Sequence, residues 1–220
     1  SAIFSVKRNE SQAPDITFYY SKPKQENFPI AIFCTGSSSK DSIYSIIHIH
    51  RHFLREFLEL GSALITLEQW GVEDKNIDAK KFIDNYTRTR RLTDHEIVIE
   101  SLLKNPPAGW NGKFIFVGVS EGGLLVTSLT EKYSDITLAA VNWSGAGDYS
   151  WREELWDFWK GMKDEIYKTL PWYIKLSSNL PKWFPFSINF PRTRKDFDIG
   201  LNLTLNDSTS KKEFLGMSYK

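Results

Sequence analysis

Hydrophobic and polar residues alternate along roughly the first two thirds of the chain in a pattern that predicts strands and helices in turn. Short apolar runs at 3–7 and 16–20 flank a polar turn and predict an opening antiparallel pair of strands. Residues 28–34 are apolar without interruption, which is typical of a strand buried on both faces. Between 43 and 58 the apolar residues recur at helical spacing, and Gly61 is the expected end of that helix.

The same alternation continues further along the chain. Residues 62–70 predict a strand, and a long polar stretch follows it. The capping box Thr93-Asp94-His95-Glu96 predicts the start of the next helix. A strand, a helix and a strand are then expected at 113–119, 121–133 and 136–145. This order predicts an α/β fold, a mostly parallel sheet with helices on both faces.

Residues beyond 150 have a different composition. Five of the eight tryptophans lie between 151 and about 195, where no convincing buried strand is found. We therefore expect a core at 1–150, an inserted helical, aromatic-rich cap at 151–200, and a return toward the core at 201–220. The aromatic residues of the cap either form an apolar lid over an acyl or aromatic substrate or only pack the insertion onto the core. These residues are Trp156, Phe158, Trp159, Trp172, Tyr173, Trp183, Phe184 and Phe186.

Composition narrows the functional classes. With 220 residues, 41% hydrophobic content and a net charge of +1, the chain can bury a sizeable core and offers no case for nucleic acid binding. It has no apolar run of about 18 residues, so no membrane span is expected. Cys34 is the only cysteine, which excludes intrachain disulfides and a structural cysteine zinc site. The N-terminus lacks Met and a signal pattern, so a cytoplasmic location is favoured while a trimmed, secreted or periplasmic protein stays possible.

A serine framed by glycines carries the candidate chemistry. Gly118-Val119-Ser120-Glu121-Gly122 follows an apolar strand and precedes a helix. Glycines on both sides leave room for a sharp turn that lifts a serine hydroxyl above the edge of a parallel sheet. The pattern predicts that Ser120 is a nucleophile, the alternative being a glycine-rich turn with an incidental serine.

On GVSEGG in this context, and on FCTGSSS after an earlier buried strand, the chain resembles the α/β-hydrolase family over about residues 1–150. The resemblance implies an acyl-serine intermediate on Ser120, with no cofactor and no metal. It also implies an oxyanion hole formed by the backbone N–H of Glu121 and by a donor in the earlier loop. Ser37 is the first choice for that donor and Ser38 the second, unless GSSS is only a polar turn.

The resemblance leaves one role unfilled. The family orders its catalytic residues as serine, then acid, then histidine, but all four histidines of this chain precede Ser120. We therefore expect the chain to be the N-terminal part of a longer hydrolase whose acid and histidine lie beyond Lys220. As an alternative position for the acid, which the resemblance to some relatives implies, Asp148 is a candidate; otherwise it is a plain turn residue.

The histidines themselves predict three environments. His48 and His52 lie opposite the apolar stripe of their helix, which favours a solvated face over a metal site that has no third ligand. His50 falls on the stripe and is expected to be a hydrogen-bonded core residue. His95 is turned inward with residues 98, 99 and 102, which makes it the candidate for a substitute base.

Five basic residues lie on the polar stretch and on the helix after it. They either bind an anionic head group, such as that of a phosphorylated thiol carrier, or form a solvated charge run. They are Lys80, Lys81, Arg88, Arg90 and Arg91.

The sequence thus predicts a serine hydrolase that cleaves an ester or thioester of a hydrophobic acyl substrate. The same motif fits a thioesterase, an acyltransferase or a serine peptidase, because all of them form an acyl-enzyme. A non-catalytic binding protein that kept the glycine-serine turn is the third alternative. The expected partner is a small molecule, and the oligomeric state is left open.

Overall fold

The computed structural model describes residues 1–38, 43–73, 76–145, 151–179, 191 and 193–198. The chain divides into two compact units. The described residues of the first unit lie between 1 and 145, and those of the second lie between 151 and 198.

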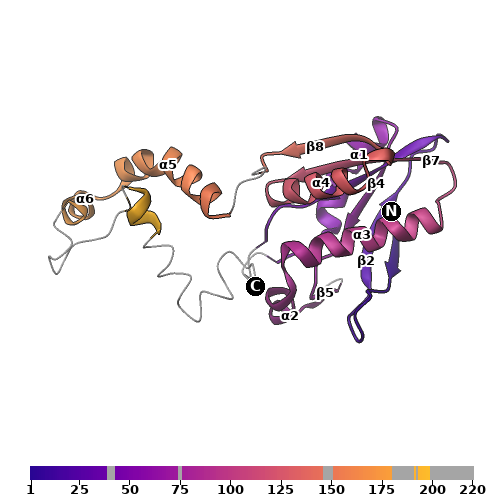
Figure 1. Cartoon of the computed structure of the whole chain (residues 1–220), viewed down its shortest axis with the longest axis horizontal. Coiled ribbons are helices and arrows are strands. Elements are labelled where there is room, and N and C mark those ends of the chain that lie inside the picture. The colour runs from indigo at the N-terminus through magenta and orange to yellow at the C-terminus, as the bar shows by residue number, and fades with distance from the viewer. Residues whose placement is uncertain (39–42, 74–75, 146–150, 180–190, 192, 199–220) are drawn as a thin grey trace. The chain divides into compact units, whose positions relative to one another are not determined.

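A six-stranded sheet forms the centre of the first unit (Figure 1). In spatial order its strands are β1 (Ala2–Val6), β2 (Ile16–Ser21), β4 (Ala63–Leu67), β3 (Phe28–Cys34), β7 (Trp110–Val119) and β8 (Thr137–Trp143). The last four are parallel, whereas β2 is antiparallel to both β1 and β4. The predicted opening antiparallel pair and the mostly parallel sheet are therefore confirmed.

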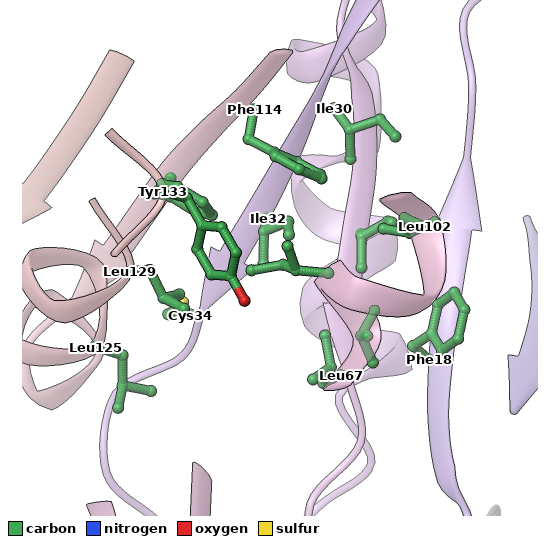
Figure 2. Packing of buried hydrophobic residues seen from close by; sticks show 14 of the residues in the cluster. Phe18, Ile30, Ile32, Cys34, Leu67, Leu102, Phe114, Leu125, Leu129 and Tyr133 are labelled. Atoms are coloured by element: carbon green, nitrogen blue, oxygen red, sulfur yellow. The ribbon is translucent and has the colours of Figure 1, made fainter. Parts of the chain in front are cut away.

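Helices cover both faces of this sheet, as the alternation predicted. Side chains of α1 (Ile47–Glu59) pack on one face, against Phe33, Leu64 and Val117. The other face packs against α3 (Arg88–Lys104) and α4 (Glu121–Lys132). Figure 2 shows this second layer, in which β3 side chains lie among leucines of the two helices. Side chains of successive β3 residues thus pack into the helix layers on opposite faces of the sheet, which explains the uninterrupted apolar sequence of this strand.

The helix predicted from residue 43 begins only at Ile47. The buried carboxylate of Glu68 accepts the backbone N–H of Ile46 at 3.0 and 3.1 Å, so the residues before α1 turn toward β4 and do not extend the helix. Gly61 ends the helix as expected, with φ +74°. The N–H groups of Gly61 and Ser62 donate to carbonyls of the last turn, which is the usual glycine-terminated ending.

The predicted start of α3 at Thr93 is wrong. The helix begins at Arg88, and the hydroxyl of its N-cap Thr87 accepts the N–H of Arg90 at 3.3 Å. Asp94, which the capping box placed at a helix start, instead accepts two hydrogen bonds of 2.8 Å from Arg8. Asp94 is therefore a mid-helix residue that forms a buried ion pair with Arg8, from the segment after β1.

Several short elements were not predicted. The polar stretch before α3 contains a two-stranded hairpin and a helix, namely β5 (Val72–Glu73), β6 (Asn76–Ile77) and α2 (Ala79–Asn85). A 3-10 turn at Ser134–Ile136 joins α4 to β8.

The described part of the second unit is helical, with α5 (Trp151–Thr169) and α6 (Trp172–Ser178). Its aromatic residues divide between two environments. The ring centroids of Trp156 and Phe197 are 5.4 Å apart, and the indole N–H of Trp159 donates to the carbonyl of Pro191. In contrast, Phe158, Trp172 and Tyr173 are exposed. Trp183, Phe184 and Phe186 lie outside the described residues. Within those residues, no helix has the length and apolar character needed to cross a membrane.

Candidate active site

The candidate site lies where the connections of two neighbouring strands diverge. β3 and β7 are parallel neighbours, with Cys34 opposite Gly118 at their carboxyl ends. The chain leaves β3 toward α1 on one face and leaves β7 toward α4 on the other. Open α/β sheets bind ligands at such a switch point. The loop expected to hold the oxyanion donor follows β3, and Ser120 follows β7.

Ser120 has an unusual backbone conformation. Its φ of 53° and ψ of −124° fall in a region that non-glycine residues rarely occupy, at a cost of about 1–3 kcal/mol. Two backbone hydrogen bonds of 2.9 Å hold it there, from its own N–H to the Trp143 carbonyl and from the Gly123 N–H to its carbonyl. This is the tight strand-to-helix turn that the glycine-serine pattern predicts.

The flanking glycines allow close backbone contact around this turn. A Cβ atom on Gly118 would collide with the backbone of Gly122, and one on Gly122 would collide with the carbonyl oxygen of Cys34. Because the colliding atoms belong to the backbone, no change of rotamer can relieve the overlap. The start of α4 therefore packs directly on the end of β3.

The loop after β3 lies against the same turn. A Cβ atom on Gly36 would be 3.2 Å from the Val119 carbonyl oxygen and 3.3 Å from Ser120 Cβ. Next to it, Ser37 is exposed and Ser38 is buried. The structure thus brings Ser120 together with the loop that holds both candidate donors.

Glu121 is the first residue of α4, so its N–H is one of the unpaired donors at a helix N-terminus. Its carboxylate lies 2.8 Å from Arg91, and both side chains are at most 10% exposed. The basic stretch is therefore not a single surface. Lys80 and Arg88 are exposed, as a solvated charge run would be, but Arg91 is buried. Arg91 lies four residues before His95 on the inward stripe of α3, and this spacing was the missed signal.

The four histidines occupy the predicted environments. His48 and His52 are exposed on α1. His50 is fully buried, and its two ring nitrogens lie 2.9 Å from the Ser21 hydroxyl and 3.0 Å from the Thr66 hydroxyl. His95 is also buried, and its Nδ1 is 2.7 Å from the Arg91 carbonyl oxygen. In the described part of the chain, none of the four forms a hydrogen bond with Ser120.

The two buried histidines make stability depend on pH. Burial lowers the pKa of His50 and of His95 to about 4, and nearby positive charges add to this effect. Unfolding returns each pKa to about 6.5, so the unfolded chain takes up protons that the folded chain does not. Their contribution is complete above pH 6.5 and is lost as the pH falls toward about 4. We expect urea unfolding between pH 7 and 5 to show this loss. His50→Gln should make the free energy of unfolding depend less steeply on pH, whereas His52→Gln should not change that dependence. An equal dependence on pH in His50→Gln and the wild type would contradict the lowered pKa of His50.

Among the described residues, no group of three or more His, Cys, Asp and Glu side chains could hold a metal ion. Asp148, the candidate acid, lies outside the described residues.

Solved structures similar to this chain come from several proteins. The alignment with a proline iminopeptidase from Mycobacterium smegmatis covers 95% of this chain and 69% of that protein, with 11% identity and a TM-score of 0.53. The alignment with VinJ covers 96% of this chain and 69% of that protein, with 14% identity and a TM-score of 0.53. Est1E from Butyrivibrio proteoclasticus, solved with ferulic acid, is 21% identical with a TM-score of 0.45 over 71% of this chain. The matched region is only 54% of Est1E, so the chain spans about half the length of that relative. No protein-family model matches the chain, and no curated protein is similar to it in sequence.

Proposed function

The chain has the α/β-hydrolase fold, and on this premise we propose that the protein is a serine hydrolase with Ser120 as its nucleophile. One observation carries the proposal. Ser120 is held in a strained conformation at the switch point of the sheet, with the loop after β3 packed against it. Strain of this kind persists where the surrounding structure imposes it, and it concentrates at active sites.

The chemistry follows from this placement. The Ser120 hydroxyl attacks the carbonyl carbon of the substrate, and the carbonyl oxygen becomes an oxyanion. The N–H groups of Glu121 and Ser37 are the proposed donors to that oxyanion. Each such donor contributes about 3 kcal/mol to transition-state stabilisation. Collapse of the intermediate expels the alcohol or thiol and leaves an acyl-serine, which water then hydrolyses.

The proton of Ser120 needs an acceptor, and His95 is a poor one. A base whose pKa is lowered to about 4 takes up protons weakly at neutral pH. Its Nδ1–H donates to the Arg91 carbonyl oxygen, and in the described part of the chain neither of its ring nitrogens is hydrogen-bonded to Ser120. We therefore assign the base to none of the four histidines of this chain. Whichever group is the general base, it receives the Ser120 proton during attack and returns it to the departing alkoxide or thiolate.

For the substrate, we propose an ester or thioester with a hydrophobic acyl group. The exposed aromatic side chains Phe158, Trp172 and Tyr173 support this choice, because apolar surfaces of this kind suit acyl chains. A peptidase is the second candidate, since one similar structure is a proline iminopeptidase. A non-catalytic binding protein is the third.

Labelling with a fluorophosphonate probe tests the proposal. We expect the natural protein to react and mass spectrometry to locate the adduct on Ser120. Turnover of nitrophenyl esters, acyl thioesters and amino-acid anilides would then separate esterase, thioesterase and peptidase. A protein that is not labelled and turns over none of these substrates would favour the binding role.

A further inference from the structure

Tyr86, just before α3, and Arg91, in the first turns of α3, both contact the loop after β3. Tyr86, between α2 and α3, donates its hydroxyl hydrogen to the Gly36 carbonyl oxygen at 2.9 Å. Arg91, in the first turns of α3, donates one guanidinium N–H to the Thr35 carbonyl oxygen. Two consecutive carbonyl groups of the loop are thus hydrogen-bonded by side chains five residues apart in the sequence.

These contacts also fix the direction of two amide N–H groups. A carbonyl and the N–H that follows it belong to one planar, trans peptide unit, in which they point in opposite directions. Because Tyr86 holds the Gly36 carbonyl, the N–H of Ser37 is turned away from Tyr86. In the same way, the hydrogen bond from Arg91 to the Thr35 carbonyl sets the direction of the Gly36 N–H, which points away from Arg91.

Arg91 links this loop to the nucleophile turn. Its other guanidinium nitrogen lies 2.8 Å from the carboxylate of Glu121, the residue directly after Ser120. Its guanidinium also lies 4.8 Å from the centre of the Tyr86 ring. Burial lowers the pKa of Arg91, but Tyr86 and Glu121 raise it and the net direction is upward, so the side chain stays charged.

The charge of Glu121 gives the link an electrostatic role. Its side chain is only 10% exposed and belongs to the residue whose backbone N–H is the proposed oxyanion donor. An uncompensated negative charge at this position would oppose the formation of an oxyanion. Arg91 balances that charge.

We propose that Arg91 and Tyr86 are positioning residues for the oxyanion hole: they orient the loop donors after β3, and Arg91 neutralises Glu121 next to the second donor. The inference rests on the proposed function of Ser120, and it assigns to both residues an effect on the transition state more than on substrate binding.

Kinetics of the natural protein test the electrostatic part. Arg91→Met should lower kcat by about 10- to 100-fold with KM changed less than about 3-fold, because the donors act in the transition state. Adding Glu121→Gln should restore about 5-fold or more, because it removes the unpaired charge. Arg55→Met is the matched control, since Arg55 is an exposed residue of α1 that pairs with Glu56 and Glu59 and should leave kcat unchanged. If Glu121→Gln causes a further loss in the Arg91→Met protein, the electrostatic role is wrong.

NMR relaxation tests the positioning part without relying on turnover. In the wild type and in Arg55→Met, the backbone order parameters of Gly36 and Ser37 should be about 0.85, and in Arg91→Met and Tyr86→Phe they should fall below about 0.6. Tyr86→Phe removes one oxygen atom and keeps the packing, so it carries the test if Arg91→Met does not fold. Unchanged order parameters in Tyr86→Phe would overturn the inference, even if Ser120 is labelled. An unreactive Ser120 with lowered order parameters would instead overturn the proposed function and keep the positioning of the loop.

Discussion

Ser120→Ala is expected to abolish covalent labelling and to lower kcat by at least about 10⁴-fold. The change removes the only atom that attacks the substrate, while the loop and the helix N-terminus stay in place to bind it. KM should therefore change little. Alanine and serine both carry a Cβ atom, so the backbone strain at this position is similar for the two residues. The melting temperature should therefore stay within a few degrees. Both parameters follow from initial rates on the ester found in the substrate panel.

Ser128→Ala is the matched control for this change. Ser128 lies on the same helix, and its hydroxyl donates to the Leu124 carbonyl, away from the nucleophile turn. Its activity should equal that of the wild type. If Ser120→Ala retains more than a tenth of the wild-type activity, another residue is the nucleophile and the proposal is wrong.

Gly122→Ala should cause a large loss of stability. The new methyl group would overlap the carbonyl oxygens of Cys34 and Thr35, and the backbone would have to move. We expect the free energy of unfolding to fall by about 3 kcal/mol, at the upper end for overpacked sites. Because α4 would be pushed from the end of β3, activity should fall even in the fraction that folds. Urea unfolding followed by tryptophan fluorescence measures the first effect.

Gly161→Ala provides the contrast. Gly161 lies within α5, and a Cβ atom there would have no neighbour within 4 Å. Alanine favours a helix over glycine by about 1 kcal/mol, so this change should stabilise α5. Equal stability of Gly122→Ala and the wild type would show that the turn is less tightly packed than described.

Much of the fold could be predicted because its signals are local. The continuous apolar run of β3, the helical spacing in α1 and the glycine-serine pattern each occupy one short segment. The same holds for the site, where the strand-turn-helix context of Ser120 was evident from the residues on either side.

The errors have the opposite cause, because they involve polar residues whose partners are distant in the sequence. Asp94 pairs with Arg8, 86 positions away, and Arg91 pairs with Glu121, 30 positions away. Each was interpreted from its neighbours alone, Asp94 as part of a capping box and Arg91 as part of a charge run. Helical spacing sets Arg91 and Asp94 on the buried side of α3, but it does not identify the distant partner that makes a charged residue stable where apolar ones are expected.

The backbone at Ser120 also bears on how such a sequence changes over time. Glycine adopts a positive φ without the strain that serine carries, so under the proposed function the residue that best fits the fold at this position differs from the residue that can react. Selection for stability alone would favour glycine here, and under the proposed function only selection for chemistry would retain serine. Persistence of the serine across lineages would thus record how long the activity has been under selection.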